Sequence, residues 1–325
     1  MEAFLLFSIG NSLSLALEVA AQLKLRGIIN GLSNTSYTRF ADDEFKIKSE
    51  DSVRGKDTFI IASTNPPAEN LLELLMLIDS LKRASAKTIT VIIPYYGYAR
   101  QDKKPFGREP ITAKMIAKLL EQLGIHRVVC IDLHADQIQG FFDIPVDNLR
   151  THLLFAKALA EDFPNANDLV IVSPDTGGVT RVRNLSRVIP GSSYTFCEKE
   201  RDMTNPDKII DSDLKGKVEG KCAVVYDDIT STCHSLINAV KQLKNAGAKE
   251  VSAAVIHYAC SNSTTDKIIL EQLPIKKMYT TNTNPRSEYA YKKGLVTLIS
   301  VADLLAETII KITENGSVSE LFEIK

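Results

Sequence analysis

Apolar residues along this chain fall into two kinds of segment that alternate. Short runs rich in β-branched residues predict strands over 59–62, 88–94 and 127–132. Between them, apolar residues recur at helical spacing over 70–85 and 112–123. Strands that alternate with helices are typical of a parallel sheet covered by helical layers, so the first half of the chain predicts an α/β fold.

The second half of the chain repeats this alternation. It predicts strands over 168–173, 194–197, 222–226 and 250–257, and helices over 178–188 and 232–246. The segment 301–312 is also helical in pattern and is expected to pack on either half, the N-terminal domain included. A chain of 325 residues most naturally forms two domains, which we place at 1–149 and 150–325.

The overall composition provides no global charge that would attract a polyanion. Charged residues make up 24% of the chain, and 39 basic against 40 acidic side chains leave a formal net charge of -1. A nearly neutral chain has no field that draws it to nucleic acid or to an anionic membrane. We therefore expect neither as a partner, and any bound anion must be held by a local site.

The cysteines and the first residues indicate a cytoplasmic protein. The five cysteines are odd in number and form no Cys-x-x-Cys pair, which suits a reducing compartment. The apolar start of the chain does not fit a signal peptide, because it carries Glu2 and no Lys or Arg, and Gly-Asn-Ser at 10–12 interrupts it. No apolar stretch approaches the length of a membrane span.

Polar residues gather directly after three predicted strands, where ligands bind in open α/β sheets. In chain order they are Asp132, His134 and Asp136; Ser173, Asp175, Gly177 and Gly178; and Asp227 and Asp228. His134 and Asp175 are candidate direct or water-mediated ligands of a divalent cation, because Mg²⁺ takes oxygen ligands and bridges triphosphate oxygens. The alternative for a lone histidine is a structural role.

The segment 227–235 joins a predicted strand to a predicted helix and is rich in hydroxyl groups. Hydroxyls and backbone N–H groups at a helix start can surround a phosphate, and the helix dipole favours its negative charge. The carboxylates of Asp227 and Asp228 suit sugar hydroxyls or a metal-bound water instead. The alternative is an ordinary N-capped helix, in which Asp, Ser and Thr are expected anyway.

Two further segments place cations after predicted strands. Residues 95–104 combine tyrosines with Arg100, which suits a nucleotide whose phosphate meets the guanidinium; solvated surface is the alternative. Residues 198–201, Glu-Lys-Glu-Arg, follow the predicted strand 194–197. Such cations suit a triphosphate whose charge builds up in a transition state, although a salt-bridged surface turn has the same sequence.

Longer motifs are specific enough to indicate a family. Residues 132–147, DLHADQIQGFFDIPVD, match a family signature almost residue for residue, and supporting matches lie at 81–88, 93–102, 108–114 and 173–178. On these motifs the chain resembles the ribose-phosphate pyrophosphokinases, also called phosphoribosyl pyrophosphate synthetases, along nearly its whole length.

The resemblance implies a fold and a reaction. It implies two phosphoribosyltransferase-like domains, each with a mostly parallel central sheet flanked by helices, an active site between them, and a homo-oligomer, either a dimer or a hexamer. The family transfers the pyrophosphoryl group of ATP to C1 of ribose 5-phosphate, which gives phosphoribosyl pyrophosphate and AMP. ATP and ribose 5-phosphate are thus the expected partners, and Mg²⁺ is the expected cofactor.

The family's functional residues carry over to matching positions of this chain. ATP contacts fall on Arg100 and Gln101, and on three residues that the family lends to the neighbouring subunit, Phe40, Asp42 and Glu44. Mg²⁺ contacts fall on His134 and Asp175, with Asp132 nearby, and the catalytic loop matches at Lys199 and Arg201. Ribose 5-phosphate contacts fall on Asp227, Asp228, Ser231, Thr232, Cys233, His234 and Ser235.

The chain departs from the family pattern at the sugar-phosphate loop. His234 stands where Gly is usual, Ser235 where Thr is frequent and Ser231 where Asp is frequent. Gly is favoured where a backbone amide approaches phosphate closely or where φ is positive, so we expect one or both of these conditions at position 234. In the element that carries Phe40, Asp43 also replaces a usual Gly.

Two other functions stay open on the sequence. A phosphoribosyltransferase, which consumes phosphoribosyl pyrophosphate, shares the Asp-Asp loop, although the ATP-like half and the motif 132–147 argue against it. A non-catalytic regulatory subunit of the synthetase is motivated by His234 and Ser235. Formation of AMP from ATP and ribose 5-phosphate separates these hypotheses from the synthetase.

Overall fold

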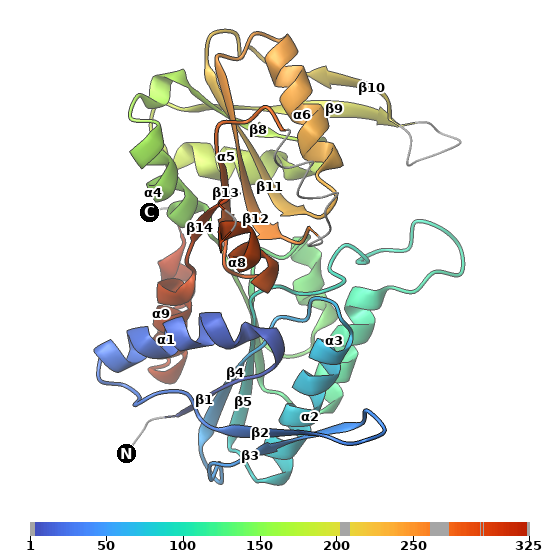
Figure 1. The fold of residues 1–325 in the computed structure, drawn as a ribbon, viewed down its shortest axis with the longest axis vertical. Coiled ribbons are helices and arrows are strands. Elements are labelled where there is room, and N and C mark those ends of the chain that lie inside the picture. The colour runs from blue at the N-terminus through green and yellow to red at the C-terminus, as the bar shows by residue number, and fades with distance from the viewer. Residues whose placement is uncertain (1–3, 202–208, 261–272, 293, 295, 324–325) are drawn as a thin grey trace. The chain divides into compact units, whose positions relative to one another are not determined.

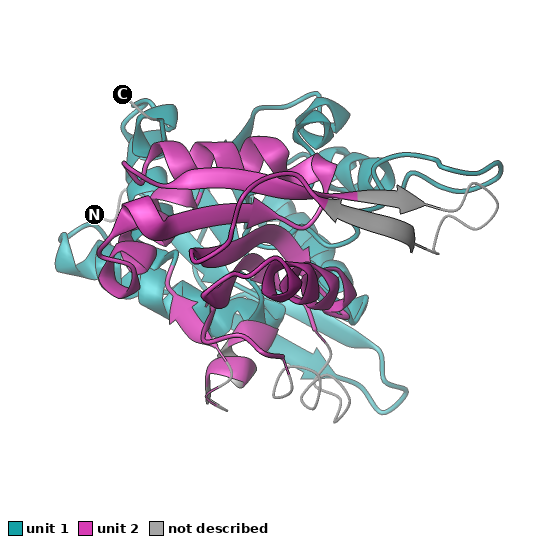
Figure 2. Ribbon diagram, turned by 90° about the horizontal axis from the view of Figure 1, so that it is seen from above, with its two compact units in different colours: residues 1–150, 283–285, 301–323 teal, residues 151–282, 286–300, 324–325 magenta. Residues whose placement is uncertain are grey.

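The computed structural model describes residues 4–201, 209–260, 273–292, 294 and 296–323 (Figure 1). The chain divides into two compact units, coloured separately in Figure 2. Unit 1 comprises Met1–Arg150, Thr283–Pro285 and Val301–Glu323; unit 2 comprises Thr151–Asn282, Arg286–Ser300 and Ile324–Lys325. Each unit has its own central sheet.

Unit 1 is built on a five-stranded sheet in which every neighbouring pair of strands is parallel. Its order is β1 (Leu5–Ser8), β4 (Asp57–Ile61), β5 (Thr88–Ile93), β6 (Arg127–Ile131) and β7 (Val146–Leu149). The strands predicted over 59–62, 88–94 and 127–132 are confirmed as β4, β5 and β6. Parallel strands are covered on both faces, which explains their unbroken apolar runs.

Two predicted helices of unit 1 are confirmed and supply the core on the sheet. They are α2 (Glu69–Arg83) and α3 (Thr112–Gln122). Their buried apolar residues, Leu74 and Ile116 among them, join the strand residues in one cluster. The sheet and these helices are therefore stabilised together by burial of one apolar layer.

The last predicted helix, 301–312, is confirmed as α9 (Ala302–Thr313) and belongs to unit 1. It packs against α1 (Leu13–Leu25). At the end of α1, Arg26 Nη2 lies 2.6 Å from Asp303 Oδ1. A helix far along the sequence thus completes the N-terminal unit.

An antiparallel hairpin forms a separate small sheet in unit 1. It pairs β2 (Thr35–Arg39) with β3 (Phe45–Ser49). The Tyr37 ring stacks on the Phe45 ring at a centroid distance of 5.4 Å. Most side chains of β2 are exposed, which is why no apolar run predicted this strand.

Unit 2 contains a seven-stranded sheet. In spatial order its strands are β10 (Ile209–Leu214), β9 (Ser193–Arg201), β8 (Leu169–Ser173), β11 (Cys222–Thr230), β12 (Glu250–Tyr258), β13 (Met278–Thr281) and β14 (Thr297–Ile299). The β9–β10 pair is antiparallel, and the other neighbouring pairs are parallel. The strands predicted in this half correspond to β8, β9, β11 and β12.

Besides α9, the described residues of the second half form the α-helices α4 (His152–Asp162), α5 (Val179–Arg187), α6 (His234–Asn245) and α8 (Pro285–Lys292). The predicted helices 178–188 and 232–246 are confirmed as α5 and α6. Leu236 and Val240 of α6 pack in one core with Val225 and Val255 of the sheet.

Short 3-10 turns occur in both halves of the chain and cover Gly10–Ser12, Asp136–Phe141, Ala166–Asp168, Thr176–Gly178 and Ser319–Leu321.

Two predicted strand ends are wrong. The strand predicted over 222–226 continues to Thr230, because its register with β12 runs on through Asp227, Ile229 and Thr230 after the pairing with β8 stops at Val225. The strand predicted over 194–197 continues to Arg201, because β10 pairs with it. In both places a partner strand extends the ladder beyond the apolar run that predicts it.

Candidate active site

The strand order of the unit 2 sheet reverses between β8 and β11. From β8 the chain runs outward through β9 to β10, and it then returns to place β11 on the other side of β8 (Figure 1). In open α/β sheets ligands bind beyond the carboxyl ends of the strands at such a switch point. Asp175 follows β8, and Asp227 and Asp228 lie in the last part of β11. Three predicted site residues therefore meet where the topology favours a ligand.

Asp175 fixes the turn between β8 and α5. Its Oδ1 accepts a hydrogen bond from the Gly178 N–H (3.2 Å), and its carbonyl accepts one from the Ser173 hydroxyl (2.6 Å). A Cβ at Gly178 would collide with Ser173 Oγ, so any other residue there would displace the hydroxyl that bonds to the Asp175 carbonyl. The carboxylate is half-buried and held in one direction at the end of β8.

Arg181, in the first turn of α5, pairs with both carboxylates of the Asp-Asp pair. Its Nη1 lies 3.1 Å from Asp227 Oδ1, and its Nη2 lies 3.2 Å from Asp228 Oδ1. The Asp228 side chain is only 6% exposed, and that of Asp227 is 20% exposed. A planar guanidinium fixes two anions in one geometry and offsets part of their repulsion. The two carboxylates are therefore oriented before any ligand arrives.

Burial raises the pKa of Asp227 well above its ordinary value, and the charge of Asp228 adds to this rise. Arg181 lowers the pKa again, and Asp175 raises it further. Acidic groups gathered at a poorly solvated place gain stability when hydroxyl donors or a cation approach them. Such perturbed carboxylates are typical of binding and catalytic sites.

The segment that follows β11 has the form of an anion site at a helix start. Ser231 and Thr232 form a bend, Cys233 is the N-cap of α6, and His234 and Ser235 begin its first turn. The first N–H groups of a helix have no partner within the helix, and the dipole there favours negative charge. The side chains of Thr232, His234 and Ser235 are exposed. The five predicted loop residues thus share one turn that a phosphate can reach.

The left-handed residue of this loop is Cys233, with φ 58, and not His234. Of the two conditions expected at position 234, a positive φ is not found, because α6 already begins at His234. The His234 ring is exposed, and its Nδ1 lies 3.1 Å from Thr232 Oγ1. The unusual backbone and the unusual side chain of the loop are therefore at neighbouring positions.

Lys199 and Arg201, the predicted catalytic residues, lie in the last part of β9. Their backbone is in register with Ser212 and Ile209 of β10. Their side chains lie outside the part of the chain that the structure describes, so their role stays a prediction.

In unit 1, Asp132 and His134 follow β6. Asp132 is buried with φ 39, and its N–H donates to the Leu149 carbonyl (2.9 Å). Arg150 approaches Asp132 at 3.6 Å and Asp136 at 2.6 Å. The His134 side chain is exposed. The three predicted residues at this strand end are thus together, with an arginine paired to both carboxylates.

Arg100 and Gln101 lie in the segment between β5 and α3. The Gln101 Oε1 atom accepts a hydrogen bond from the Thr112 hydroxyl (2.5 Å), and the Gln101 carbonyl accepts one from the Ala113 N–H (3.2 Å). These bonds attach the segment to the start of α3. Both side chains are exposed. Arg100 and Gln101 follow β5, which is next to β6 in the parallel sheet, and Asp132 follows β6.

The turn of the β2–β3 hairpin carries Phe40, Asp42 and Glu44. The Phe40 N–H donates to the Glu44 carbonyl (2.7 Å), and the Glu44 N–H donates to Asp42 Oδ1 (3.2 Å). Asp43 has φ 69, which explains the glycine usual at this position; Asp tolerates the conformation better than most residues. All three predicted side chains are exposed, Phe40 by 46%. The hairpin turn therefore exposes an aromatic ring and two carboxylates.

The candidate metal ligands come from two strand ends. Among the side chains that the structure describes, no three His, Cys, Asp or Glu groups are arranged to hold a metal ion. Mg²⁺ usually keeps several waters and is bound through one or two carboxylates together with substrate phosphates. Asp132 and His134 in unit 1, and Asp175 in unit 2, therefore stay predicted metal ligands, each described within its own unit.

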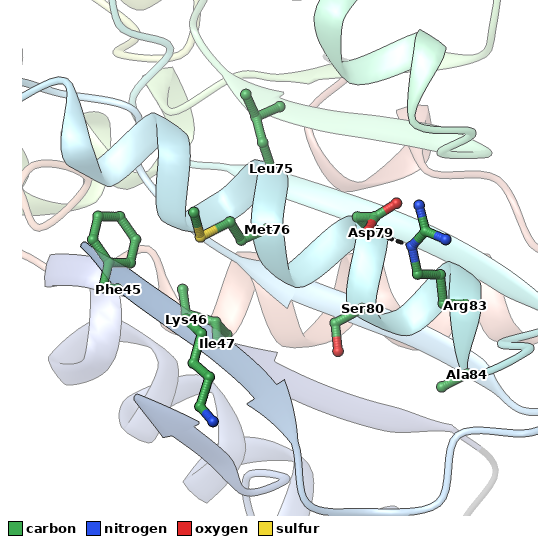
Figure 3. Close-up of a pocket in the computed structure, with 9 residues that line it drawn as sticks. All are labelled: Phe45, Lys46, Ile47, Leu75, Met76, Asp79, Ser80, Arg83 and Ala84. Carbon is green, nitrogen blue, oxygen red and sulfur yellow. Dashed lines mark hydrogen bonds and ion pairs between the residues drawn. The ribbon is translucent and has the colours of Figure 1, made fainter. Parts of the chain in front are cut away.

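A cavity of about 720 Å³ opens on unit 1 between β3 and α2 (Figure 3). Its lining combines five apolar residues with four polar or charged ones: Phe45, Lys46, Ile47, Leu75, Met76, Asp79, Ser80, Arg83 and Ala84. Figure 3 shows the Asp79–Arg83 ion pair, in which Oδ2 and Nε lie 2.7 Å apart. The predicted site residues are not part of this lining, so the cavity is separate from the strand ends described above.

Comparison with known proteins covers nearly the whole chain. Residues 4–124 match the family model described as the N-terminal domain of ribose phosphate pyrophosphokinase, and residues 199–323 match the phosphoribosyl synthetase-associated domain. A ribose-phosphate pyrophosphokinase from Thermosipho africanus is 45% identical over 318 residues, covering 98% of this chain and 96% of the relative. The chain belongs to the ribose-phosphate pyrophosphokinase family.

Other members of the pyrophosphokinase family agree with this assignment. Ribose-phosphate pyrophosphokinase 1 of Listeria monocytogenes is 42% identical over 319 residues, or 98% of this chain and 96% of its own. The crystal structure of phosphoribosylpyrophosphate synthetase from Mycobacterium smegmatis is 36% identical, covers 97% of this chain and 100% of its own, and has a TM-score of 0.86. The resemblance and the predicted α/β fold are confirmed.

Within the described residues, none of the helices has the length and apolar character needed to cross a membrane.

The sequence pattern does not predict the ion pairs that two arginines make with the carboxylates at these strand ends. Arg181 pairs with Asp227 and Asp228, and Arg150 pairs with Asp132. The sequence does place Arg181 close to the strand end, because it stands three residues after Gly178 and therefore in the first turn of a predicted helix. Arg150 gave no such signal, since it follows β7, an edge strand of four residues that the pattern does not predict.

Proposed function

We propose that this protein transfers the pyrophosphoryl group of ATP to C1 of ribose 5-phosphate and releases AMP. The observation that carries the proposal is the β8–β11 switch point in a chain of this family. There Arg181 orients Asp227 and Asp228 immediately before the helix-start loop 231–235. Two hydrogen-bond acceptors beside an anion-binding turn are complementary to a sugar that carries hydroxyl groups and one phosphate.

In this assignment the 5-phosphate lies at the start of α6. The backbone N–H groups of residues 231–235 and the Thr232 hydroxyl donate to its oxygens, and the helix dipole adds to the attraction. Asp227 and Asp228 accept hydrogen bonds from the ribose hydroxyls. The two interactions together fix the direction in which C1 points.

ATP is assigned to the residues of unit 1 and to a second copy of the chain. Arg100 binds phosphate, and Gln101 holds the segment that follows β5 on α3. Phe40, Asp42 and Glu44 on the exposed hairpin turn contact the adenine held by a neighbouring subunit. We infer a homo-oligomer from this division of the nucleotide site.

The reaction is an in-line attack by the C1 hydroxyl of ribose 5-phosphate on the β-phosphorus of ATP. The new bond joins the C1 oxygen to the β-phosphorus, the bond from that phosphorus to the α,β-bridging oxygen breaks so that AMP leaves, and the proton of the C1 hydroxyl passes to solvent. Lys199 and Arg201 stabilise the charge that develops on the transferred group and on the leaving oxygen. The predicted site offers no obvious general base, so positioning supplies much of the rate enhancement.

The oxygen and nitrogen donors at the strand end of each unit suit a divalent cation. Asp132 and His134 of unit 1, and separately Asp175 of unit 2, are the residues that would hold a divalent cation, directly or through water. When bound, Mg²⁺ supplies neutralisation of the triphosphate charge. Asp175 is suited to the task, because its capping bond to Gly178 already fixes its carboxylate.

We infer a cytoplasmic location from the thiols. The five cysteines are all present as thiols, and a reducing compartment keeps them so.

The decisive experiment incubates purified protein with ribose 5-phosphate, ATP and Mg²⁺ and measures AMP and phosphoribosyl pyrophosphate. Both products should appear in equal amounts, and both should depend on ribose 5-phosphate. A folded, assembled protein that forms no AMP would instead indicate a regulatory subunit. Release of pyrophosphate from supplied phosphoribosyl pyrophosphate when a nucleobase is added would indicate a phosphoribosyltransferase.

A further inference from the structure

Two buried cysteines meet at the proposed sugar-phosphate loop. Cys233 immediately precedes α6, Cys260 follows β12, and their Sγ atoms lie 3.4 Å apart. Cys233 is 3% exposed, and Cys260 is 0% exposed. A disulfide has an S–S distance of about 2.05 Å, so an approach of roughly 1.4 Å would join these sulfurs.

The surroundings of Cys233 favour negative charge on its sulfur. The Thr230 hydroxyl donates a hydrogen bond to Cys233 Sγ at 3.4 Å. Cys233 also lies at the N-terminal end of α6, where the helix dipole favours an anion. Because the thiolate is the nucleophilic form of cysteine, Cys233 is the member of the pair suited to react first.

Cys260 is held beside Cys233 by contacts of its own. Its thiol is directed at the Thr230 carbonyl at 3.7 Å, and the Ala259 N–H donates to the same carbonyl at 2.8 Å. Thr230 therefore contacts both cysteines, one through its hydroxyl and the other through its carbonyl. Closure of the pair needs local movement of the loop and no rearrangement of β11 or β12.

A small oxidant has a route to this pair. Thr232 and His234, on either side of Cys233, are exposed. Opening of the bend at 231–233 uncovers the Cys233 sulfur while the sheet and α6 stay folded, since local openings of this kind need less free energy than global unfolding.

We propose that Cys233 and Cys260 form a reversible oxidation site, at which a hydroperoxide converts two thiols into a disulfide. With hydrogen peroxide, the Cys233 thiolate attacks one oxygen; an S–O bond forms, the O–O bond breaks, and the departing hydroxide is protonated to water. The Cys260 sulfur then attacks the sulfenic sulfur; the S–S bond forms, the S–O bond breaks, and a second water leaves. Two electrons pass from the thiols to the peroxide, and a dithiol reductant returns them.

The disulfide disables the sugar-phosphate loop, and this part of the inference rests on the proposed function. Cys233 is the left-handed residue between Thr232 and His234, so movement of its side chain toward Cys260 rotates the peptide groups on both sides. The N–H groups of residues 231–235 then no longer converge on one anion. Oxidation weakens the binding of ribose 5-phosphate, whereas the nucleotide residues of unit 1 are unaffected.

The test compares full-length protein in the reduced state with the same protein after treatment with hydrogen peroxide. Digestion without reductant and mass spectrometry should give a peptide in which Cys233 is joined to Cys260, and dithiothreitol should remove it. Calorimetry should show ribose 5-phosphate binding weakened roughly tenfold or more, as expected for lost hydrogen bonds to a charged group. The affinity for ATP should not change.

Matched variants separate this pair from the other thiols. Cys260→Ala should keep its affinity for ribose 5-phosphate after peroxide treatment, whereas Cys222→Ala, at the opposite end of β11, should lose it like the unaltered protein. Cys260→Ser repeats the test with a residue closer in volume if the alanine variant does not fold. Absence of the crosslinked peptide, or a crosslink that leaves sugar-phosphate binding unchanged, overturns the inference. If reduced protein forms no AMP, the proposed function fails, while the crosslink and the calorimetry still decide the oxidation site.

Discussion

Arg181 on α5 reaches across to β11 and pairs with Asp227, with 3.1 Å between Nη1 and Oδ1. The same guanidinium pairs with Asp228, so one side chain orients both acceptors of the proposed sugar site. Arg181→Met leaves two poorly solvated carboxylates without their cation, a change that costs about 3–5 kcal/mol when a buried pair loses one partner. We expect a raised KM for ribose 5-phosphate and little change in the KM for ATP, measured by the rate of AMP formation.

Two controls test whether Arg181 is a positioning residue. Arg181→Lys keeps the positive charge but loses the planar guanidinium whose two nitrogens pair with two carboxylates. Its KM for ribose 5-phosphate should therefore lie between those of the native protein and the methionine variant. Arg187→Met, at the exposed end of the same helix, should behave like the native protein. Equal rises in both KM values for Arg181→Met would mean that the residue acts on folding rather than on the sugar site.

Asp227 makes stability depend on pH in an unusual direction. Its pKa is raised in the folded state, mainly by burial, so its contribution to stability is present below the ordinary pKa of about 3.9 and is lost as pH rises toward the folded value. Asp227→Asn keeps the shape without the charge. We expect its free energy of unfolding, relative to the native protein, to increase from about pH 4 to pH 7, measured by urea unfolding at fixed ionic strength.

Asp162 provides a control of opposite sign in the same unit. Hydrogen bonds from Lys277 and then Tyr279 lower the pKa of Asp162, so its stabilisation is present above the ordinary pKa and is lost as pH falls through the folded value. Asp162→Asn should therefore destabilise the protein at neutral pH and not in acid. The effect should stay below about 1 kcal/mol, because the side chain is 35% exposed. Parallel pH profiles for the two variants would contradict the assignment for Asp227.

The sequence predicts those elements whose own residues determine them. β5 is an apolar run and α3 has an apolar face, and both have clear boundaries in the sequence. The structure contains each element where the pattern predicts it. The end of β11 is different, because Asp227 and Thr230 are strand residues only through their pairing with β12. Propensity along the chain contains no information about that partner.

The candidate site shows the same division. Asp175 and the Asp-Asp pair follow predicted strands and could be found from spacing. The pairing of Arg181 with Asp227 depends on how α5 packs beside β11, which is a tertiary property. The positive φ lies at Cys233 and not at position 234, where the usual glycine makes it only one of two possible backbone conditions, since His234 is already the first residue of α6.

His234 should therefore have little effect on sugar-phosphate affinity. Its ring is exposed and bonds to Thr232, and its N–H is available at the start of α6 whatever the side chain. We expect His234→Gly to change the KM for ribose 5-phosphate by less than about threefold, and to lower stability by up to about 1 kcal/mol. Thr232→Val, which removes a hydroxyl donor to phosphate, should raise this KM roughly tenfold. A tenfold gain in affinity for His234→Gly would show that the ring obstructs the site.

Lys199 should act on turnover more than on binding. Its proposed interaction is with charge that develops at the transferred group, so it is made chiefly in the transition state. Lys199→Ala should reduce kcat by about two orders of magnitude or more and alter both KM values much less. Lys217→Ala, an exposed lysine after β10, is the matched control. Near-normal turnover of Lys199→Ala would exclude the catalytic role.

The hairpin residues should serve the site of a second subunit, and mixing two defective variants tests this directly. Phe40→Ala lacks the proposed adenine contact, and Lys199→Ala lacks the catalytic cation. In a mixed dimer one site combines Phe40 from the Lys199→Ala chain with Lys199 from the Phe40→Ala chain, so it is complete. With random pairing about a quarter of all sites regain both groups, and AMP formation should rise to about a quarter of the native rate after the two proteins are dissociated and reassembled. If Phe40 instead contacts ATP within its own subunit, the mixture gives only the mean of the two separate activities.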